Sequence, residues 1–173
     1  PDSSSVEFWL NGVGRIFAYN EWMDMPNGRD ENPYVFESEV LSPFAKLDPG
    51  ESYRWQYEWL ACRIGGDFPV LDCSEAGLVS QPLTCCRTKD GVRLAGRFGV
   101  FQLGQLVLES RDKANKALAR TIVVPKATPL EPIVLAQTIE IPTTARRAVL
   151  FLVDANGRDV GQIASGNVSD FRK

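Results

Sequence analysis

Aromatic rings, carboxylates, amides and arginines are concentrated in one polar segment near the start of the chain, residues 19–31. Saccharide recognition needs such groups together, because an aromatic face covers the apolar surface of a sugar ring while polar side chains bind its hydroxyls. We therefore predict a carbohydrate site here, made by Tyr19, Glu21, Trp22, Asp24, Arg29 and Asp30. The alternative is a surface loop in which Trp22 fills a core position.

A second candidate surface follows the turn Asp48-Pro49-Gly50. Residues 51–63 alternate strictly, which predicts a strand. One face carries aromatic rings that we expect in the core: Tyr53, Trp55, Tyr57 and Trp59. The other face carries Arg54, Gln56 and Glu58, which either line a concave sugar site or form the solvated face of a sheet.

Histidine is absent, which excludes Ser-His-Asp and Cys-His catalysis and HExxH zinc sites. Carboxylates remain: Glu37 and Glu39 share one strand face, and Glu58 is a third acid that could lie near them. Glycoside hydrolysis needs two such groups facing each other across a cleft. No catalytic residue is assigned, and a carboxylate-dependent glycan-processing enzyme fragment stays open as an alternative.

No cofactor or metal site is predicted. Asp24, Asp30 and Glu31 have oxygen ligands suited to calcium, but the EF-hand spacing is absent. The four cysteines are Cys62, Cys73, Cys85 and Cys86, and none belongs to a CxxC motif. Neighbouring strand residues point to opposite faces, so Cys85 and Cys86 should not bond to each other. Cys62 and Cys73 flank a Gly-rich loop and either form a disulfide or stay free.

The net charge of −3 hides an asymmetry between the two halves of the chain. Residues 1–86 hold 14 acidic and 5 basic side chains, whereas residues 87–173 hold 8 acidic and 14 basic ones. The pattern fits two domains or halves of opposite charge that attract each other. It also fits a basic C-terminal half that binds a polyanion. The basic residues form no dense cluster, so we expect no nucleic-acid partner. No apolar run approaches the ~18 residues of a membrane helix.

The element pattern predicts an all-β protein without a convincing helix. Strands are expected at 6–10, 15–19 and 34–41 around a loop at 20–33. After a linker at 65–75, seven short strands are expected at 76–84, 91–101, 104–110, 118–124, 130–140, 147–153 and 158–164. Asn156-Gly157 is a strong hairpin signal. Seven strands in this span predict an antiparallel, immunoglobulin-like sandwich at 76–173.

Residues 37–43 (ESEVLSP), followed by Leu47-Asp48-Pro49-Gly50-Glu51-Ser52-Tyr53 and 55–59 (WQYEW), resemble the last strands of galactose-mutarotase-like β-supersandwich domains in bacterial proteins. The resemblance covers residues 6–64 and implies a partial supersandwich at 1–64 with a carbohydrate-related role. Mutarotases use a catalytic histidine, so that activity is not expected here. The later half is similar, in strand number, to immunoglobulin-like accessory domains of carbohydrate-active enzymes.

These observations favour a non-catalytic carbohydrate-binding or accessory module of a larger secreted or periplasmic protein. Its expected partners are a glycan and either an upstream segment of the same protein or a homo-oligomer partner. The alternative is a structural or protein-interaction module with no ligand of its own. The first residues, Pro1-Asp2-Ser3-Ser4-Ser5, suggest a processed product or a fragment.

Overall fold

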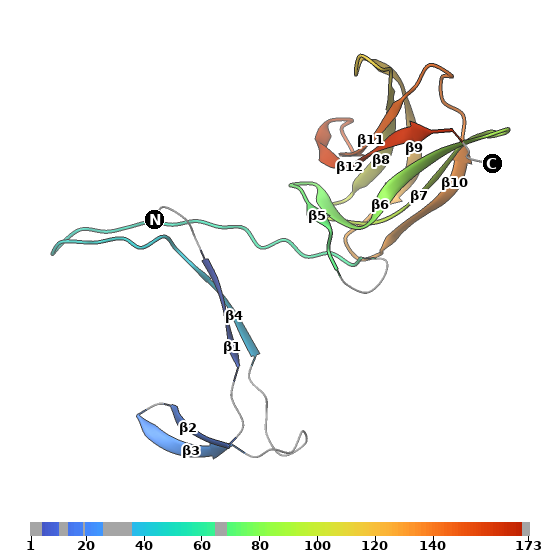
Figure 1. Cartoon of the computed structure of the whole chain (residues 1–173). Coiled ribbons are helices and arrows are strands. Elements are labelled where there is room, and N and C mark those ends of the chain that lie inside the picture. The colour runs from blue at the N-terminus through green and yellow to red at the C-terminus, as the bar shows by residue number, and fades with distance from the viewer. Residues whose placement is uncertain (1–4, 11–13, 19, 26–35, 65–68, 171–173) are drawn as a thin grey trace. The chain divides into compact units, whose positions relative to one another are not determined.

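The computed structural model describes residues 5–10, 14–18, 20–25, 36–64 and 69–170 (Figure 1). Its regular elements in these ranges are all strands, which confirms the predicted all-β class. The chain separates into two compact units, Pro1–Glu58 and Trp59–Lys173, here called the N-terminal and C-terminal units. Within the described ranges no helix is long and apolar enough to cross a membrane.

The N-terminal unit contains two separate two-stranded antiparallel sheets. Strand β1 (Ser5–Leu10) pairs with β4 (Phe36–Leu41), and β2 (Gly14–Ala18) pairs with β3 (Glu21–Met25). Strands β1, β2 and β4 were predicted, whereas β3 lies where a loop was expected. That prediction was wrong because Asn20, at φ 65°, lets the chain reverse between β2 and β3, and asparagine tolerates this conformation better than most residues.

The structure forms no strand at residues 51–63, so the prediction of a strand there was wrong. The chain is irregular over residues 42–64 and 69–71 apart from the Asp48–Glu51 turn, in which the Glu51 N–H donates to the Asp48 carbonyl. The expected core residues Tyr53, Tyr57 and Trp59 are exposed, and Trp55 is half-buried. Alternation creates a strand only where a neighbouring strand takes up the backbone hydrogen bonds, and no such partner pairs with 51–63 in the described ranges.

The C-terminal unit confirms all seven strands predicted after the linker region. They are joined by a short additional strand, and the full set is β5 (Asp72–Cys73), β6 (Gly77–Thr88), β7 (Gly91–Val100), β8 (Gly104–Arg111), β9 (Ala117–Ala127), β10 (Ile133–Ile139), β11 (Arg147–Val153) and β12 (Asp159–Ser169). The Asn156-Gly157 hairpin joins β11 to β12 as expected. Residues 112–116 form the loop between β8 and β9.

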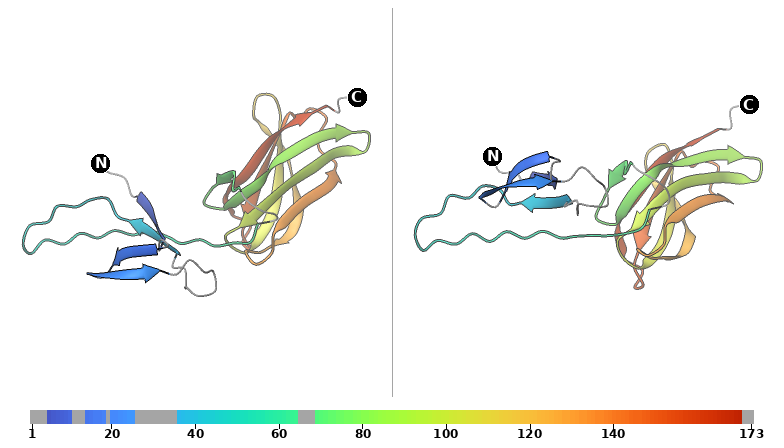
Figure 2. Two further views of the ribbon diagram at one scale, coloured as in Figure 1. Left: turned by 60° about the horizontal axis from the view of Figure 1, so that its bottom comes forward. Right: turned by 90° about the horizontal axis from the view of Figure 1, so that it is seen from below.

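These strands form one mixed sheet in the order β10-β7-β6-β12-β11-β8-β9, with β5 beside β6. Neighbours are antiparallel except β12 and β6, whose parallel contact spans Val168 and Ser169 opposite Cys85 and Cys86. The sheet curves around a common interior, which Figure 2 shows from two further directions. Its two outer strands, β10 and β9, lie close enough for a hydrogen bond: Gln137 Nε2 of β10 donates to the Val123 carbonyl of β9 at 2.9 Å. The sheet is therefore nearly closed and barrel-like.

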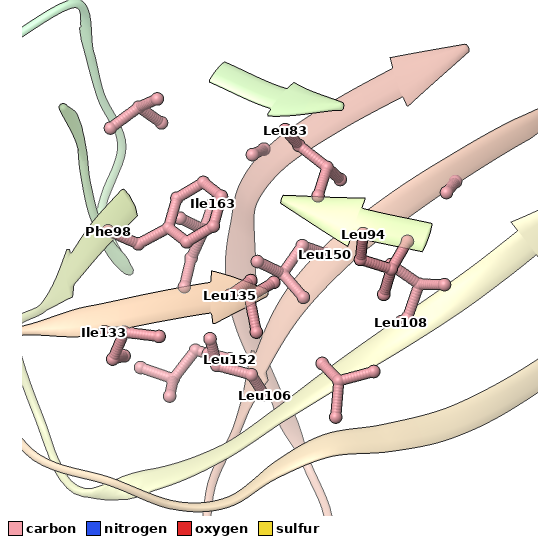
Figure 3. Packing of buried hydrophobic residues seen from close by; sticks show 14 of the residues in the cluster. Leu83, Leu94, Phe98, Leu106, Leu108, Ile133, Leu135, Leu150, Leu152 and Ile163 are labelled. Carbon is pink, nitrogen blue, oxygen red and sulfur yellow. The ribbon is translucent and has the colours of Figure 1, made fainter. Parts of the chain in front are cut away.

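The hydrophobic core fills the interior of this sheet. Alternate residues of a strand point inward, as in β10, where Ile133 and Leu135 are buried while Val134 and Ala136 are exposed. Leucines from several strands pack with Phe98 and Ile163 at the centre (Figure 3). Among the residues whose side chains are described, every buried hydrophobic one lies between Ala76 and Val168. The core thus belongs to the C-terminal unit.

Candidate binding surface

The β2–β3 hairpin brings four side chains together on one face. Phe17 lies directly opposite Trp22, and Arg15 lies directly opposite Asp24. Opposite residues, and residues two apart on one strand, share a face of a sheet. The Phe17 and Trp22 rings meet edge to face with centroids 5.3 Å apart, and the Arg15 guanidinium lies 5.3 Å from the Trp22 ring centroid. We call these four residues the hairpin face.

The hairpin face is open to solvent. Trp22 is 62% exposed and Phe17 is 58% exposed, while Arg15 and Asp24 are also exposed. The alternative in which Trp22 fills a core position is therefore wrong. Sequence reasoning named Trp22 and Asp24 but missed Arg15 and Phe17, because it had no β3 to pair with β2. The signal that could have predicted the hairpin is Asn20, a residue that favours turns, between two short segments of alternating polar and apolar residues.

The structure describes only some of the other predicted carbohydrate-binding residues, and those lie outside the four-residue hairpin face. Glu21 is exposed at the start of β3, and Tyr19, Arg29 and Asp30 lie outside the described residues. Arg54, Gln56 and Glu58 are exposed on the irregular segment at 51–58. The hairpin face is therefore assembled from Trp22 and Asp24 with two residues that the sequence did not suggest.

Several described apolar side chains of the N-terminal unit are exposed. Phe44 is 91% exposed, and Val6, Leu47, Tyr53 and Tyr57 are each about half exposed or more, from 46% to 55%. The Trp55 and Tyr57 rings contact each other with centroids 4.6 Å apart, so each ring covers part of the other. Among the described strands, β1 and β4 pair only with each other, so each has one edge that no other strand covers. Such edges and apolar side chains are suited to a further strand or surface.

The cysteines lie in the C-terminal unit and are all free thiols. Cys85 points into the core, and burial, with a smaller effect from neighbouring Cys86, raises the pKa of the Cys85 thiol to about 12. Burial, and secondarily Cys73, also raises the pKa of Cys62. Cys73 is exposed at the end of β5, so it is the accessible thiol of that pair.

An ion-pair network crosses the outer face of β8 and β9. Glu109 accepts from Arg111 Nε at 2.7 Å, and Arg120 Nη2 donates to Asp159 Oδ1 at the same distance. Arg120 also lies 3.6 Å from Glu109 and over the Phe151 ring. Sequence reasoning missed this network because it depends on strand register. Every group in it is already engaged, so we assign it a structural role.

The remaining polar features of the described residues are less suited than the hairpin face to bind a saccharide. Among the described side chains, no group of three or more Cys, Asp or Glu is arranged to hold a metal ion. A groove of about 390 Å³ lies between Leu103, Pro125, Lys126 and the Asp154–Gly157 turn. Asp154 in that groove is occupied by hydrogen bonds from Asn156 and Arg158.

Comparisons with known proteins give no relative from which a role can be transferred: no family model, curated protein or solved structure matches the chain.

Proposed function

We propose that this chain is a non-catalytic interaction module, in which the C-terminal unit is the folded support and the N-terminal unit supplies the binding surface. The observation that carries the proposal is the distribution of buried side chains. All buried hydrophobic residues described lie from Ala76 onward, whereas Phe44, Tyr53 and Tyr57 of the N-terminal unit are exposed. The partner we favour is a second copy of the chain.

The physical reason is the small size of the N-terminal sheets. A two-stranded sheet in water is marginally stable, and covering apolar surface contributes about 25 cal/mol per Å². A surface that covers the exposed apolar side chains of the N-terminal unit therefore stabilises its two-stranded sheets. A folded partner that adds a strand to an open edge also satisfies its backbone hydrogen bonds.

Sedimentation equilibrium of the full chain tests this proposal. We expect concentration-dependent self-association that weakens in the double variant Val6→Ser with Phe44→Ser. The matched control is Leu130→Ser, which removes an apolar side chain that is 74% exposed in the C-terminal unit. A chain that stays monomeric at all concentrations, with β1 and β4 amides exchanging as slowly as those of the barrel, would refute the proposal.

A carbohydrate ligand is the second candidate, and the hairpin face favours it. Trp22 offers an exposed ring, and Arg15 and Asp24 supply a donor and an acceptor beside it. This arrangement has the ingredients that a pyranose needs, a flat apolar surface next to hydroxyl-binding groups. The resemblance of residues 37–59 to β-supersandwich domains supports the same ligand class and, with it, an exported bacterial protein.

A glycan array followed by calorimetry distinguishes the two candidates. We expect Trp22→Ala to abolish binding of any glycan found, and Trp59→Ala to leave it unchanged, since Trp59 is comparably exposed but belongs to the C-terminal unit. Absence of glycan binding, or equal losses in the two variants, would remove the carbohydrate candidate.

We also propose an immunoglobulin-like sandwich as the finer description of the C-terminal unit. The strand order supports it, because β6, β7 and β10 are neighbours on one side and β9, β8, β11 and β12 on the other. Between the described strands of the two groups, backbone pairing is limited to the short β12–β6 contact, and the Gln137 bond links the other edges. A crystal structure in which β12 and β6 are hydrogen-bonded along their full length would contradict this assignment.

A further inference from the structure

Cys62 and Cys73 lie on one face of the sheet in the C-terminal unit. Cys73 of β5 is opposite Leu78 of β6, and Leu78 is opposite Gly99 of β7. The Cys62 Sγ covers Gly99, since a Cβ added to that glycine would lie 2.5 Å from the sulfur. Opposite residues project to the same face, so both thiols lie along one row with Leu78 between them.

The two backbone segments that carry these thiols are held differently. The Cys62 segment is fixed by the hydrogen bond from the Arg63 N–H to the Pro129 carbonyl at 2.8 Å. Strand β5 has two residues and, among the described strands, pairs with β6 alone, off the main strand order of the sheet. Gly99 lies two strand spacings, roughly 10 Å, from Cys73, and the Cys62 sulfur lies over Gly99 on the face that Cys73 shares. A disulfide needs Cα atoms within about 7 Å of each other, so the bond forms only when β5 and the Cys62 segment are that close.

We propose that Cys62 and Cys73 are a redox-sensitive pair that a small-molecule disulfide converts into an intramolecular disulfide, fastening β5 to the Cys62 segment. Cys73 is the exposed thiol, and its thiolate attacks one sulfur of glutathione disulfide and releases one glutathione. The Cys62 thiolate then attacks the Cys73 sulfur of the mixed disulfide and releases the second glutathione. Two protein thiols are oxidised to one disulfide, their two protons pass to the departing glutathione thiolates, and one glutathione disulfide is thereby reduced to two glutathione thiols.

The remaining cysteines provide the contrast. Cys85 is buried in the core, and Cys86 is its half-buried neighbour that accepts a contact from Ser169 Oγ at 3.6 Å. Adjacent strand residues point to opposite faces, so these two thiols cannot form the corresponding pair. Cys86→Ser is therefore a matched control, because it removes a thiol without touching the Cys62–Cys73 row.

The test is intact-mass analysis and non-reducing peptide mapping of the native full chain incubated with glutathione disulfide. We expect the loss of two hydrogen masses and a linked peptide containing Cys62 and Cys73, in the wild type and in Cys86→Ser. Cys62→Ser should instead trap glutathione on Cys73, and Cys73→Ser should leave Cys62 largely unmodified. Independent glutathione adducts on both cysteines in the wild type, unmodified thiols, or a Cys73-linked dimer would overturn the proposal.

A second readout separates the bond from incidental oxidation. The Arg63 amide, which donates to Pro129, should exchange with deuterium more slowly in the oxidised chain than in the reduced chain. Unchanged exchange at Arg63 in the oxidised form would contradict the proposed fastening of this segment.

Discussion

At the scale of single residues, Gly99 shows how closely the start of the C-terminal unit packs on its sheet. A Cβ at this position would lie 2.5 Å from Cys62 Sγ and 2.7 Å from the Arg63 carbonyl oxygen. The second of these atoms belongs to the backbone, so a side-chain rotation cannot relieve the clash. Glycine is therefore required by its neighbours rather than by its own backbone conformation.

We predict that Gly99→Ala lowers the free energy of unfolding by about 1–3 kcal/mol, the usual cost of overpacking. Urea denaturation measures the loss, and amide exchange at Arg63 should accelerate because the segment is displaced. Gln81→Ala, an exposed substitution on neighbouring β6, is the control and should leave both quantities unchanged. Wild-type stability in Gly99→Ala would show that the Cys62–Ile64 segment is not seated on β7.

Asp154 organises the turn between β11 and β12. Its carboxylate accepts the backbone N–H groups of Asn156 and Arg158 and the Arg158 guanidinium, at 2.8 to 3.1 Å. The backbone bond from Arg158, followed by that from Asn156, lowers the pKa of Asp154 below its ordinary 3.8. Gly157 completes the turn at φ 80°, where a residue with a Cβ would be strained.

The lowered pKa of Asp154 makes its contribution to stability pH-dependent. A carboxyl group whose folded-state pKa is depressed stabilises the fold above its unfolded pKa, and this contribution is lost as pH falls through the folded value. We predict that Asp154→Ala is less stable than wild type at pH 7 and that the difference shrinks below about pH 3.8. Thermal unfolding across pH measures it, with Asp90→Ala at another turn as control. A difference independent of pH would contradict this role.

At the scale of elements, the bond between β10 and β9 controls how far the sheet closes. Gln137 Nε2 donates to the Val123 carbonyl at 2.9 Å, and Val123 is buried. We predict that Gln137→Met, which keeps the length but removes the donor, lowers the free energy of unfolding by about 1 kcal/mol. Deuterium exchange should also rise in β9 near Val123 and in β10, whereas Ala136→Ser on the exposed side should change neither. Unchanged exchange in both strands would show that this bond does not hold the edges together.

The C-terminal strands were predictable because local signals agree with the global fold. Lys89-Asp90-Gly91 and Asp154-Ala155-Asn156-Gly157 contain the residues that hairpin turns need, and the alternation between them matches the buried face. The Tyr53–Trp59 stripe carries the same alternation, yet it is not a strand here. Alternation reports that a segment can bury one face, and it does not say whether a partner is present to bury it.

At the scale of the whole molecule, the central claim is that the C-terminal unit supplies the stable core and the N-terminal unit supplies the binding surface. The C-terminal unit holds the buried core described, and the N-terminal unit exposes apolar side chains and strand edges. The sequence indicated two regions from its charge and strand spacing. It could not show which region contains the core, because both regions are rich in apolar residues and every Trp and Tyr lies in the first 59 residues.

Equilibrium urea unfolding of residues 59–173 beside the full chain, at low concentration where the full chain is monomeric, tests this claim most directly. If the core of Ala76–Val168 supplies the cooperative stability, both proteins will unfold in one transition with the same midpoint and a similar free energy. A midpoint clearly lower for residues 59–173, or failure of that segment to fold, would show that the N-terminal unit is part of the stable core and would contradict the account.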